Sequence, residues 1–456
     1  KAIATMAKGT SIWKLLKVPL NPPSVVRNVG SNMILMNLVG GIPIHKVMPR
    51  MHQAIKEIQN NGKHWKIAQE FGIKNTGFSE QEMYRISEQY LDLLQEEHPL
   101  GDVTRFFSPK IIMNKIFKKA GDIYQFTESV GKTAVIIDAM ERQGMSDIDA
   151  FMLAQKSLFD YSDVPEAGKQ FRKAPIGMPF FTFYYKALPA LIETAVKHPM
   201  RYAPYVALSA GLTQLASYAF GFEDDEEEKL QKSLQPWLER RTGVYVLPYK
   251  DSDGRFQFLD VGYFFPWSMY TDSIKAVSNG EFMELQRTTG LFSGPFVDIL
   301  LAMKTNKDPF TQRTIWDKRD PIEDRIQNMW WYMYSLGMPS WLTPTGAISK
   351  TTKAISGSPR PTGEPADTIP QALLRFVGVN VYGIDTKDSR TRNIKRMRQD
   401  IQDIRQRLSY SQADKTLTEE EKEKQRVRYM QLLIEKKNLL QQYKIDTAIP
   451  RSVLER

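Results

Sequence analysis

The strongest constraint on this chain is an uncharged run at residues 202–222, which follows a basic stretch at 197–201 and precedes an acidic run at 223–228. As a helix, its twenty-one residues span about 30 Å, the thickness of the hydrocarbon core of a bilayer. Polar residues such as Thr213 and Gln214 make the run only moderately apolar. Two structures therefore fit it: a helix inserted in a membrane, and a central helix buried in a soluble bundle.

Composition limits the remaining possibilities. The chain has 456 residues, a mean hydropathy of −0.41 and 42% hydrophobic residues, which excludes a polytopic membrane protein and predicts two to four helical modules. Cysteine is absent, so disulfides, thiolate metal sites and cysteine nucleophiles are excluded. A formal charge of +10 favours contact with polyanions. Because residue 1 is Lys rather than Met, we expect a processed product or part of a longer protein.

Hydrophobic periodicity predicts a mainly α fold built from several helical modules, with one small β-hairpin and a C-terminal helical hairpin. We expect an N-terminal helical module at 1–100, a central helical module at 101–222, a helical module with the β-hairpin at 223–345, a Pro/Gly-containing linker at 346–388, and a coiled-coil-like hairpin at 389–446.

Both hairpins have local signals. Asp253-Gly254 lies between two alternating apolar runs and predicts a β-hairpin over 244–261. The later oxygen ligands of a calcium loop are missing there, so turn chemistry is the better interpretation. At the C-terminus, Thr418 followed by three Glu residues predicts a helix start. The helix before it has apolar residues spaced as in a coiled-coil seam, namely Ile394, Met397, Ile401, Ile404 and Leu408.

The uncharged run holds the first group of candidate site residues. Small side chains recur on one stripe and would let a neighbouring helix approach closely. Larger apolar side chains lie on the opposite face. The candidates for membrane insertion or oligomerisation are Ala203, Ala207, Leu208, Gly211, Leu212 and Ala219.

An aromatic segment lies just before this run. Rings beside lysines are typical of the interfacial belt of a membrane protein, and equally of an aromatic core layer around a proline-kinked helix. The belt candidates are Phe180, Phe181, Phe183, Tyr184 and Tyr185. A second aromatic cluster with the same two interpretations lies at 330–334.

Basic residues gather at the start of the C-terminal hairpin. They could contact phosphates of DNA, or form the solvated face of a coiled coil. The nucleic-acid candidates are Arg390, Arg392, Lys395, Arg396 and Arg398. We interpret the acidic run at 223–228 as a solvated helix start rather than a metal site, because consecutive carboxylates on a helix point in different directions.

Signals for catalysis are weak. The five histidines are scattered, and the sequence has no nucleophile elbow, no phosphate-binding glycine loop, no zinc-protease motif and no dinucleotide fingerprint. We therefore predict no catalytic, cofactor or metal site in this chain, and no enzyme activity.

A set of short motifs is distributed along the chain. They are Thr10-Ser11, the 21–28 segment Asn-Pro-Pro-Ser-Val-Val-Arg-Asn with Asn32 after it, Phe159-Asp160-Tyr161, Phe171-Arg172, Pro179-Phe180 through Lys186, His198-Pro199 with Arg201, Asp253-Gly254-Arg255, Leu259-Asp260 and Phe265-Pro266. Over roughly the first 350 residues the chain thus resembles internal virion, or ejection, proteins of tailed phages and the large polyvalent phage proteins.

This resemblance implies a helical protein that is stored inside the capsid and delivered with the genome. After delivery, such a protein helps to form a DNA conduit through the host envelope. It implies as partners a second copy of the chain, other virion, ejection or portal proteins, genomic DNA bound without sequence preference, and the host inner membrane. The implied locations are the virion interior and then the host envelope.

Two alternatives remain open. One is a non-catalytic helical segment of a giant virion-packaged enzyme, such as a virion RNA polymerase. The other is a soluble nucleic-acid-binding scaffold.

Overall fold

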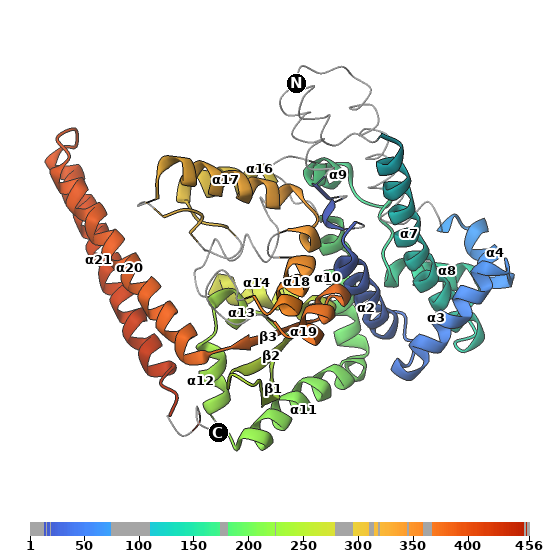
Figure 1. Ribbon diagram of the computed structural model, residues 1–456. Helices are drawn as coiled ribbons and strands as arrows, with labels where there is room; N and C mark the ends of the chain where they lie inside the picture. The colour runs from blue at the N-terminus through green and yellow to red at the C-terminus, as the bar shows by residue number, and fades with distance from the viewer. Residues whose placement is uncertain are drawn as a thin grey trace. The chain divides into compact units, whose positions relative to one another are not determined.

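The computed structural model describes residues 13–14, 16–18, 20–73, 110–173, 181–223, 225–278, 295–309, 314–317, 320–343, 346–358, 367–450 and 453. Over these residues the fold is mainly helical, with one small antiparallel sheet of three strands (Figure 1). The predicted mainly α class is therefore confirmed.

The chain forms two compact units. Unit 1 comprises Lys1–Val206 and Val261–Asn380, and unit 2 comprises Ala207–Asp260 and Val381–Arg456. The division of the sequence into five modules stays a prediction. Residues 346–388, predicted to be a linker, contain two α-helices, a 3-10 helix, a strand and the start of a further helix. The Pro/Gly-rich stretch 359–366 lies outside the described residues.

Unit 1 is a set of helices and short 3-10 turns. Its elements are α2 (Pro22–Leu38), α3 (Ile44–Gln59), α4 (Lys63–Glu70), α7 (Lys110–Glu141), α8 (Asp147–Ser157), α9 (Glu166–Lys173), α10 (Phe181–Lys197), η3 (Pro199–Arg201), η4 (Gly262–Phe264), α14 (Ser268–Ser278), α16 (Pro295–Thr305), α17 (Ile322–Gly337), η5 (Ser340–Leu342), α18 (Ala347–Ser356), α19 (Ile369–Leu374) and η6 (Arg375–Val377).

Helix α7 is at the centre of the N-terminal part of this unit. It packs against α2, α3, α4 and α8, and every residue from 129 to 139 is buried. The stretch is mostly small or β-branched, so helices can approach it from several sides. One of its buried residues is Lys132, whose Nζ donates a hydrogen bond to Oε1 of Gln155 on α8 at 3.0 Å.

A second charge in this stretch, Asp138, is fully buried and holds several elements together. Its carboxylate accepts hydrogen bonds from Arg142 at 2.7 Å and from Arg50 of α3 at 3.2 Å. Arg142 and Gln143 also donate to the carbonyl oxygens of Gly41 and Gly40, in the turn between α2 and α3. A buried carboxylate is tolerated only when it is paired and hydrogen-bonded, as it is here.

Unit 2 contains the sheet and the C-terminal hairpin. Its elements are the part of α11 (Ala203–Phe220) from Ala207 onward, α12 (Glu226–Lys232), α13 (Pro236–Glu239), β1 (Val244–Lys250), β2 (Phe256–Asp260), β3 (Asn380–Ile384, of which Val381–Ile384 lie in this unit), α20 (Thr386–Ala413) and α21 (Glu419–Asp446). Strand β2 lies between β1 and β3.

The core of unit 2 lies between the helices that flank the sheet and the sheet itself. It is made of Ala216, Phe220, Leu230, Leu234, Leu238, Val244, Val246, Phe256, Phe258 and Val453. Inside this unit Arg241 and Asp260 form a buried ion pair at 2.7 Å.

The predicted β-hairpin is present, with Val244 opposite Asp260 and Val246 opposite Phe258. Its turn is closed by Asp251, whose Oδ1 accepts the backbone N–H of Asp253 at 3.1 Å and of Arg255 at 2.9 Å. Gly254 has a φ of +73°, which favours glycine. The carboxylate therefore serves the turn, as the sequence indicates. The third strand, β3, was not predicted.

The interpretation of the acidic run as a solvated helix start is wrong for two of its residues. Glu226 and Glu227, in the first turn of α12, are both buried. The carboxylate of Glu226 accepts the backbone N–H of Glu223 at 3.0 Å, and that of Glu227 accepts the Ser217 hydroxyl at 3.2 Å. Burial raises the pKa of Glu227. These two carboxylates thus help to join α11 to α12.

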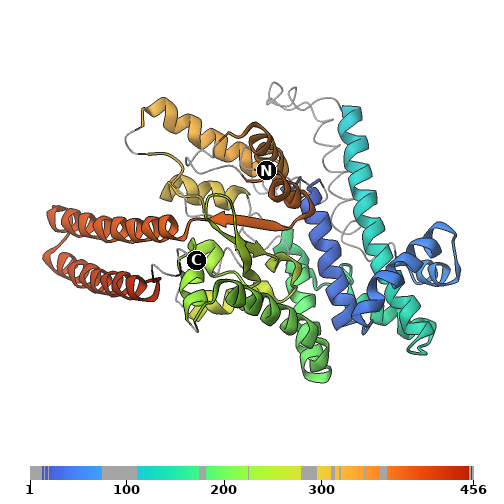
Figure 2. The ribbon, with the colours of Figure 1, turned by 60° about the horizontal axis from the view of Figure 1, so that its bottom comes forward.

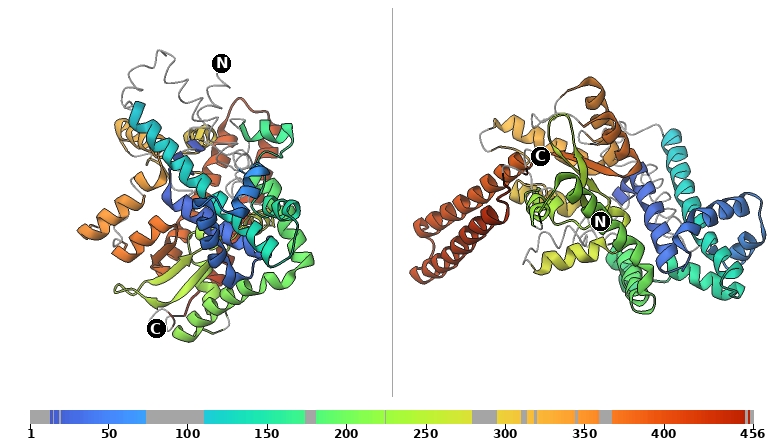
Figure 3. Two further views of the ribbon diagram at one scale, coloured as in Figure 1. Left: turned by 90° about the vertical axis from the view of Figure 1, so that its right-hand side faces the viewer. Right: turned by 90° about the horizontal axis from the view of Figure 1, so that it is seen from below.

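The C-terminal helical hairpin is confirmed. Helices α20 and α21 lie side by side along their length and extend away from the sheet of unit 2 (Figures 2 and 3). The predicted seam residues of α20 are all buried or half-buried, with Ile401 buried at the middle, as expected for a helix that packs against α21. Thr418 and Glu421 form a complete capping box at the start of α21.

We predict that Asp138→Ala lowers the free energy of unfolding by about 3 kcal/mol, because it leaves the charges of Arg50 and Arg142 without their buried partner. Chemical denaturation measures this change. The control is Asp122→Ala at an exposed position of the same helix, for which we expect a change within about 0.5 kcal/mol. Equal losses in the two variants would contradict the role assigned to Asp138.

The same carboxylate predicts a dependence on pH. Burial alone raises the pKa of Asp138, but hydrogen bonds from Arg142, Gln143 and Arg50 lower that pKa below its ordinary value of 3.8. The ionised form therefore stabilises the fold above about pH 4, and this contribution is lost as the pH falls through the lower pKa of the folded state. Urea unfolding should show a steeper loss of stability below about pH 4 for the native chain than for Asp138→Asn. Identical slopes would contradict the prediction.

Candidate functional site

One face of α11 packs against the rest of unit 2. In unit 2, Ser209 Oγ lies 2.6 Å from the hydroxyl of Tyr245 on β1, and Ala216 and Phe220 enter the core. The Phe220 ring meets the Phe256 ring edge to face, with centroids 5.1 Å apart. These positions are spaced by seven and four residues, so they form one stripe of the helix.

The remaining surface of α11 is apolar and open. Leu208 is 52% exposed, Leu215 55% and Tyr218 90%. Of the candidates from the sequence, Ala203, Ala207 and Ala219 are exposed too, whereas Leu212 and Gly211 are half-buried. A Cβ added at Gly211 would meet no atom of the described residues within 4 Å, so none of the described helices makes a close approach there.

The uncharged run forms a helix, but most of its apolar surface is exposed instead of buried in the centre of a bundle. Its insertion in a membrane stays a prediction. None of the described helices combines the length and the apolar character needed to cross a membrane.

The aromatic segment packs against other aromatic rings of unit 1. Phe181 contacts the rings of Phe171 and Tyr185, and Phe183 contacts that of Phe159, all with centroids 5.6–5.8 Å apart. Tyr184 meets the ring of Tyr270 at 6.1 Å, and burial raises the pKa of both phenols. Phe180 lies outside the described residues. The rings thus pack as an aromatic layer in unit 1, and Tyr185 is the most exposed of them.

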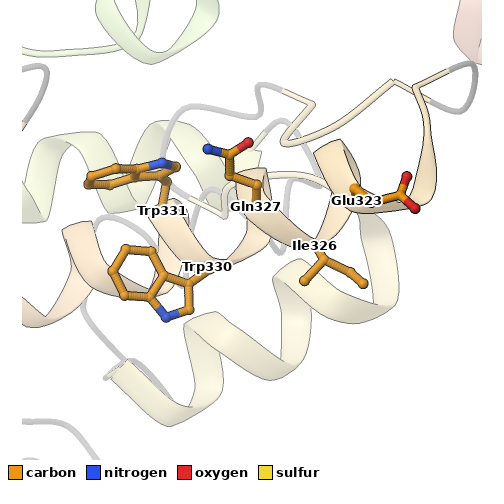
Figure 4. Close-up of a pocket in the computed structure, with 5 residues that line it drawn as sticks. All are labelled: Glu323, Ile326, Gln327, Trp330 and Trp331. Atoms are coloured by element: carbon orange, nitrogen blue, oxygen red, sulfur yellow. The ribbon is translucent and has the colours of Figure 1, made fainter. Parts of the chain in front are cut away.

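A shallow hollow of about 580 Å³ lies along α17, on one face of that helix (Figure 4). Its lining residues follow helical spacing and are Glu323, Ile326, Gln327, Trp330 and Trp331. Trp330 also stacks on Tyr334, with centroids 5.5 Å apart. The second aromatic cluster therefore forms an exposed apolar face in unit 1, comparable to that of α11.

The five basic candidates on α20 divide into two kinds. Arg390 closes the open end of the hairpin: its Nε donates to Thr447 Oγ1 at 3.0 Å and a terminal nitrogen donates to the Lys444 carbonyl at 3.1 Å. It thus satisfies a carbonyl at the C-terminal end of α21, where a cation is favourable. Arg396 is half-buried, and Arg392, Lys395 and Arg398 are exposed. Those three side chains face solvent.

Burial strongly shifts the pKa of several titratable groups, among them Lys132 and Asp298. Burial lowers the pKa of Lys132 to about 8, although Glu128 and Asp160 act against it. Burial also raises the pKa of Asp298 on α16 to about 7, and the charge of Asp308 adds to this. Among the residues described, no three His, Asp or Glu side chains gather in a way that could hold a metal ion.

Comparison with known proteins identifies no relative: neither a protein-family model, nor a curated protein, nor a solved structure matches this chain.

Leu215 and Tyr218 are exposed on α11 but are not among the candidates selected from the sequence. Leu215 follows Leu208 by seven residues and so lies on the same face of the helix, a spacing that identifies it. The contacts of Arg390 with α21 join residues more than fifty positions apart, and no local pattern reveals them.

We predict that Arg390→Met lowers the free energy of unfolding by about 1.5 kcal/mol, because hydrogen bonds from a charged donor to the end of α21 are lost. Chemical denaturation provides the measurement. Arg398→Met, at an exposed position of the same helix, is the matched control and should change stability by less than about 0.5 kcal/mol. A larger loss of stability for Arg398→Met than for Arg390→Met would contradict the structural role assigned to Arg390.

Proposed function

We propose that this chain is a structural, non-enzymatic internal virion protein of a tailed phage, which is delivered with the genome and assembles into part of a DNA conduit through the host envelope. Its location is the virion interior first and the host envelope after delivery. The partners are further copies of the chain, other virion, ejection or portal proteins, and the genome.

The observation that carries this proposal is the exposed, uncharged surface of α11. Isolated apolar side chains are normal on a protein surface, but a continuous apolar patch marks a contact with another protein or with lipid. On α11, Leu208, Leu215 and Tyr218 are exposed along a helix without a single charged residue. A conduit requires protomers that bury such surfaces against one another, or against lipid at its rim.

The exposed basic side chains of α20 support contact with the genome. Arg392, Lys395 and Arg398 lie on the part of α20 that is not covered by α21. Contacts of this kind bind phosphates without reading base sequence, as a protein that travels with the genome requires.

We predict that the double variant Leu208→Asp with Leu215→Asp weakens self-association by at least about 100-fold. Burial of a leucine stabilises a contact by about 1.5–3 kcal/mol, and both contributions are lost. Analytical ultracentrifugation over a range of concentrations measures the dissociation constant. The control is Ile355→Asp on α18, where the side chain is 70% exposed, and it should leave association unchanged.

Flotation with anionic liposomes at low and high salt tests the envelope part of the proposal with the same variants. Flotation that resists salt and is lost in the double variant supports contact of α11 with lipid. An unchanged dissociation constant together with unchanged flotation would contradict the proposed role of α11.

The second candidate is a soluble nucleic-acid-binding scaffold, favoured by the exposed cations of α20. It predicts DNA binding that weakens steeply with salt, in a chain that remains monomeric and does not float with liposomes.

A further inference from the structure

Helix α21 has two apolar faces, and the hairpin uses one of them. The face toward α20 includes Tyr429, Leu433 and Leu440. A second stripe contains Val427, Met430 and Ile434, at spacings of three and four residues, and each of these side chains is about half exposed. A helix that needs one partner carries one such stripe, so the second stripe is suited to another helix.

Charges along this second stripe are arranged in a definite order. Glu420 and Glu423 lie on it toward the N-terminus of α21, the apolar residues follow, and Lys437 lies on it toward the C-terminus. Glu423 precedes Met430 by seven residues and Lys437 follows it by seven, so all three lie on nearly the same line of the helix. Reversing the direction of the helix therefore exchanges an acidic end with a basic one.

We propose that α21 pairs with α21 of a second copy of this chain, antiparallel and about a two-fold axis near Met430. In this arrangement the apolar part of the stripe meets itself, and Glu423 of each copy lies opposite Lys437 of the other. A two-fold contact requires a surface that is complementary to itself, and the acidic–apolar–basic order provides this. A parallel pair would instead bring Glu423 against Glu423.

The ion pairs that the acidic residues make within one copy do not prevent this exchange. Glu423 lies 3.4 Å from Arg426, and Glu420 lies 2.7 Å from Lys424. All four side chains are highly exposed, and exposed pairs contribute little stability, so the carboxylates are free to change partners. Because the hairpin extends away from the sheet of unit 2, a second hairpin can lie along it (Figure 2).

The proposed pairing of α21 depends on the proposed function in one respect only: it takes a second copy of the chain as the partner. It uses α21, whereas the proposed assembly contact is on α11, so either contact can fail while the other stands.

The first test uses the absence of cysteine from the chain. Met430→Cys treated with a short bis-maleimide should give a covalent dimer. The matched control is Leu439→Cys, because Leu439 is 45% exposed against 46% for Met430 but lies on the opposite side of α21, nine residues on. Dimers from Met430→Cys alone support the proposal. No dimer from Met430→Cys, or equal yields from both variants, would overturn it.

The second test fixes the direction of the pair. Glu423→Lys alone and Lys437→Glu alone each place like charges across the axis and should weaken association about tenfold, with the combined variant restoring it. Within one helix the two residues are about 21 Å apart, so restoration arises only between copies. A combined variant as weak as the single ones would contradict the antiparallel arrangement.

A final comparison separates this inference from the proposed function. Met430→Cys placed in the Leu208→Asp, Leu215→Asp background should still give the cross-linked dimer. If the cross-linked dimer forms in this background, while the α11 substitutions abolish assembly beyond the dimer, both contacts exist. If cross-linking fails in the native background while the α11 effect remains, the pairing of α21 is wrong and the proposed function stands.

Discussion

The buried middle of α7 is the constraint on which unit 1 depends. Residues 129–139 have no exposed position, yet they include Asp138, whose charge has to be compensated inside the protein. Arg50 and Arg142 supply that compensation, and Arg142 and Gln143 also bind the carbonyl groups of the turn between α2 and α3. One carboxylate thereby helps to fix how α7 meets α3 and the turn after α2. Arg50 would lose its buried partner if α3 moved, and Arg142, which Asp138 holds in place, would lose the Gly41 carbonyl if the turn moved.

The buried helix of unit 1 is α7, whereas the uncharged run of the sequence forms α11. Helix α11 contributes one stripe to the core of unit 2 and leaves Leu208, Leu215 and Tyr218 exposed. Helix α17 presents Trp330 and Trp331 in the same way, and α21 presents a second apolar stripe. Each exposed leucine forgoes about 1.5–3 kcal/mol of burial that contact with a partner would recover. Assembly, as proposed here, accounts for all three faces.

Local patterns predicted the elements that local interactions determine. The turn at Asp253-Gly254, the start of α21 at Thr418 and the seam around Ile401 depend on neighbours within a few residues, and all three are present. Strand β3 was missed because it pairs with a strand more than a hundred residues earlier. The sequence identified α11 as unusual but not which of its faces is exposed, because a helix without charges has no polar face to mark the solvent side.

The central claim is that the open surface of α11 becomes covered when the protein assembles, and a probe at Tyr218 tests it most directly. Tyr218 is 90% exposed and the chain lacks cysteine, so Tyr218→Cys can be labelled at one position with a polarity-sensitive fluorophore. The emission should shift to the blue as the protein concentration rises or when liposomes are added. Emission typical of a water-exposed probe at every concentration, with and without liposomes, would contradict the account.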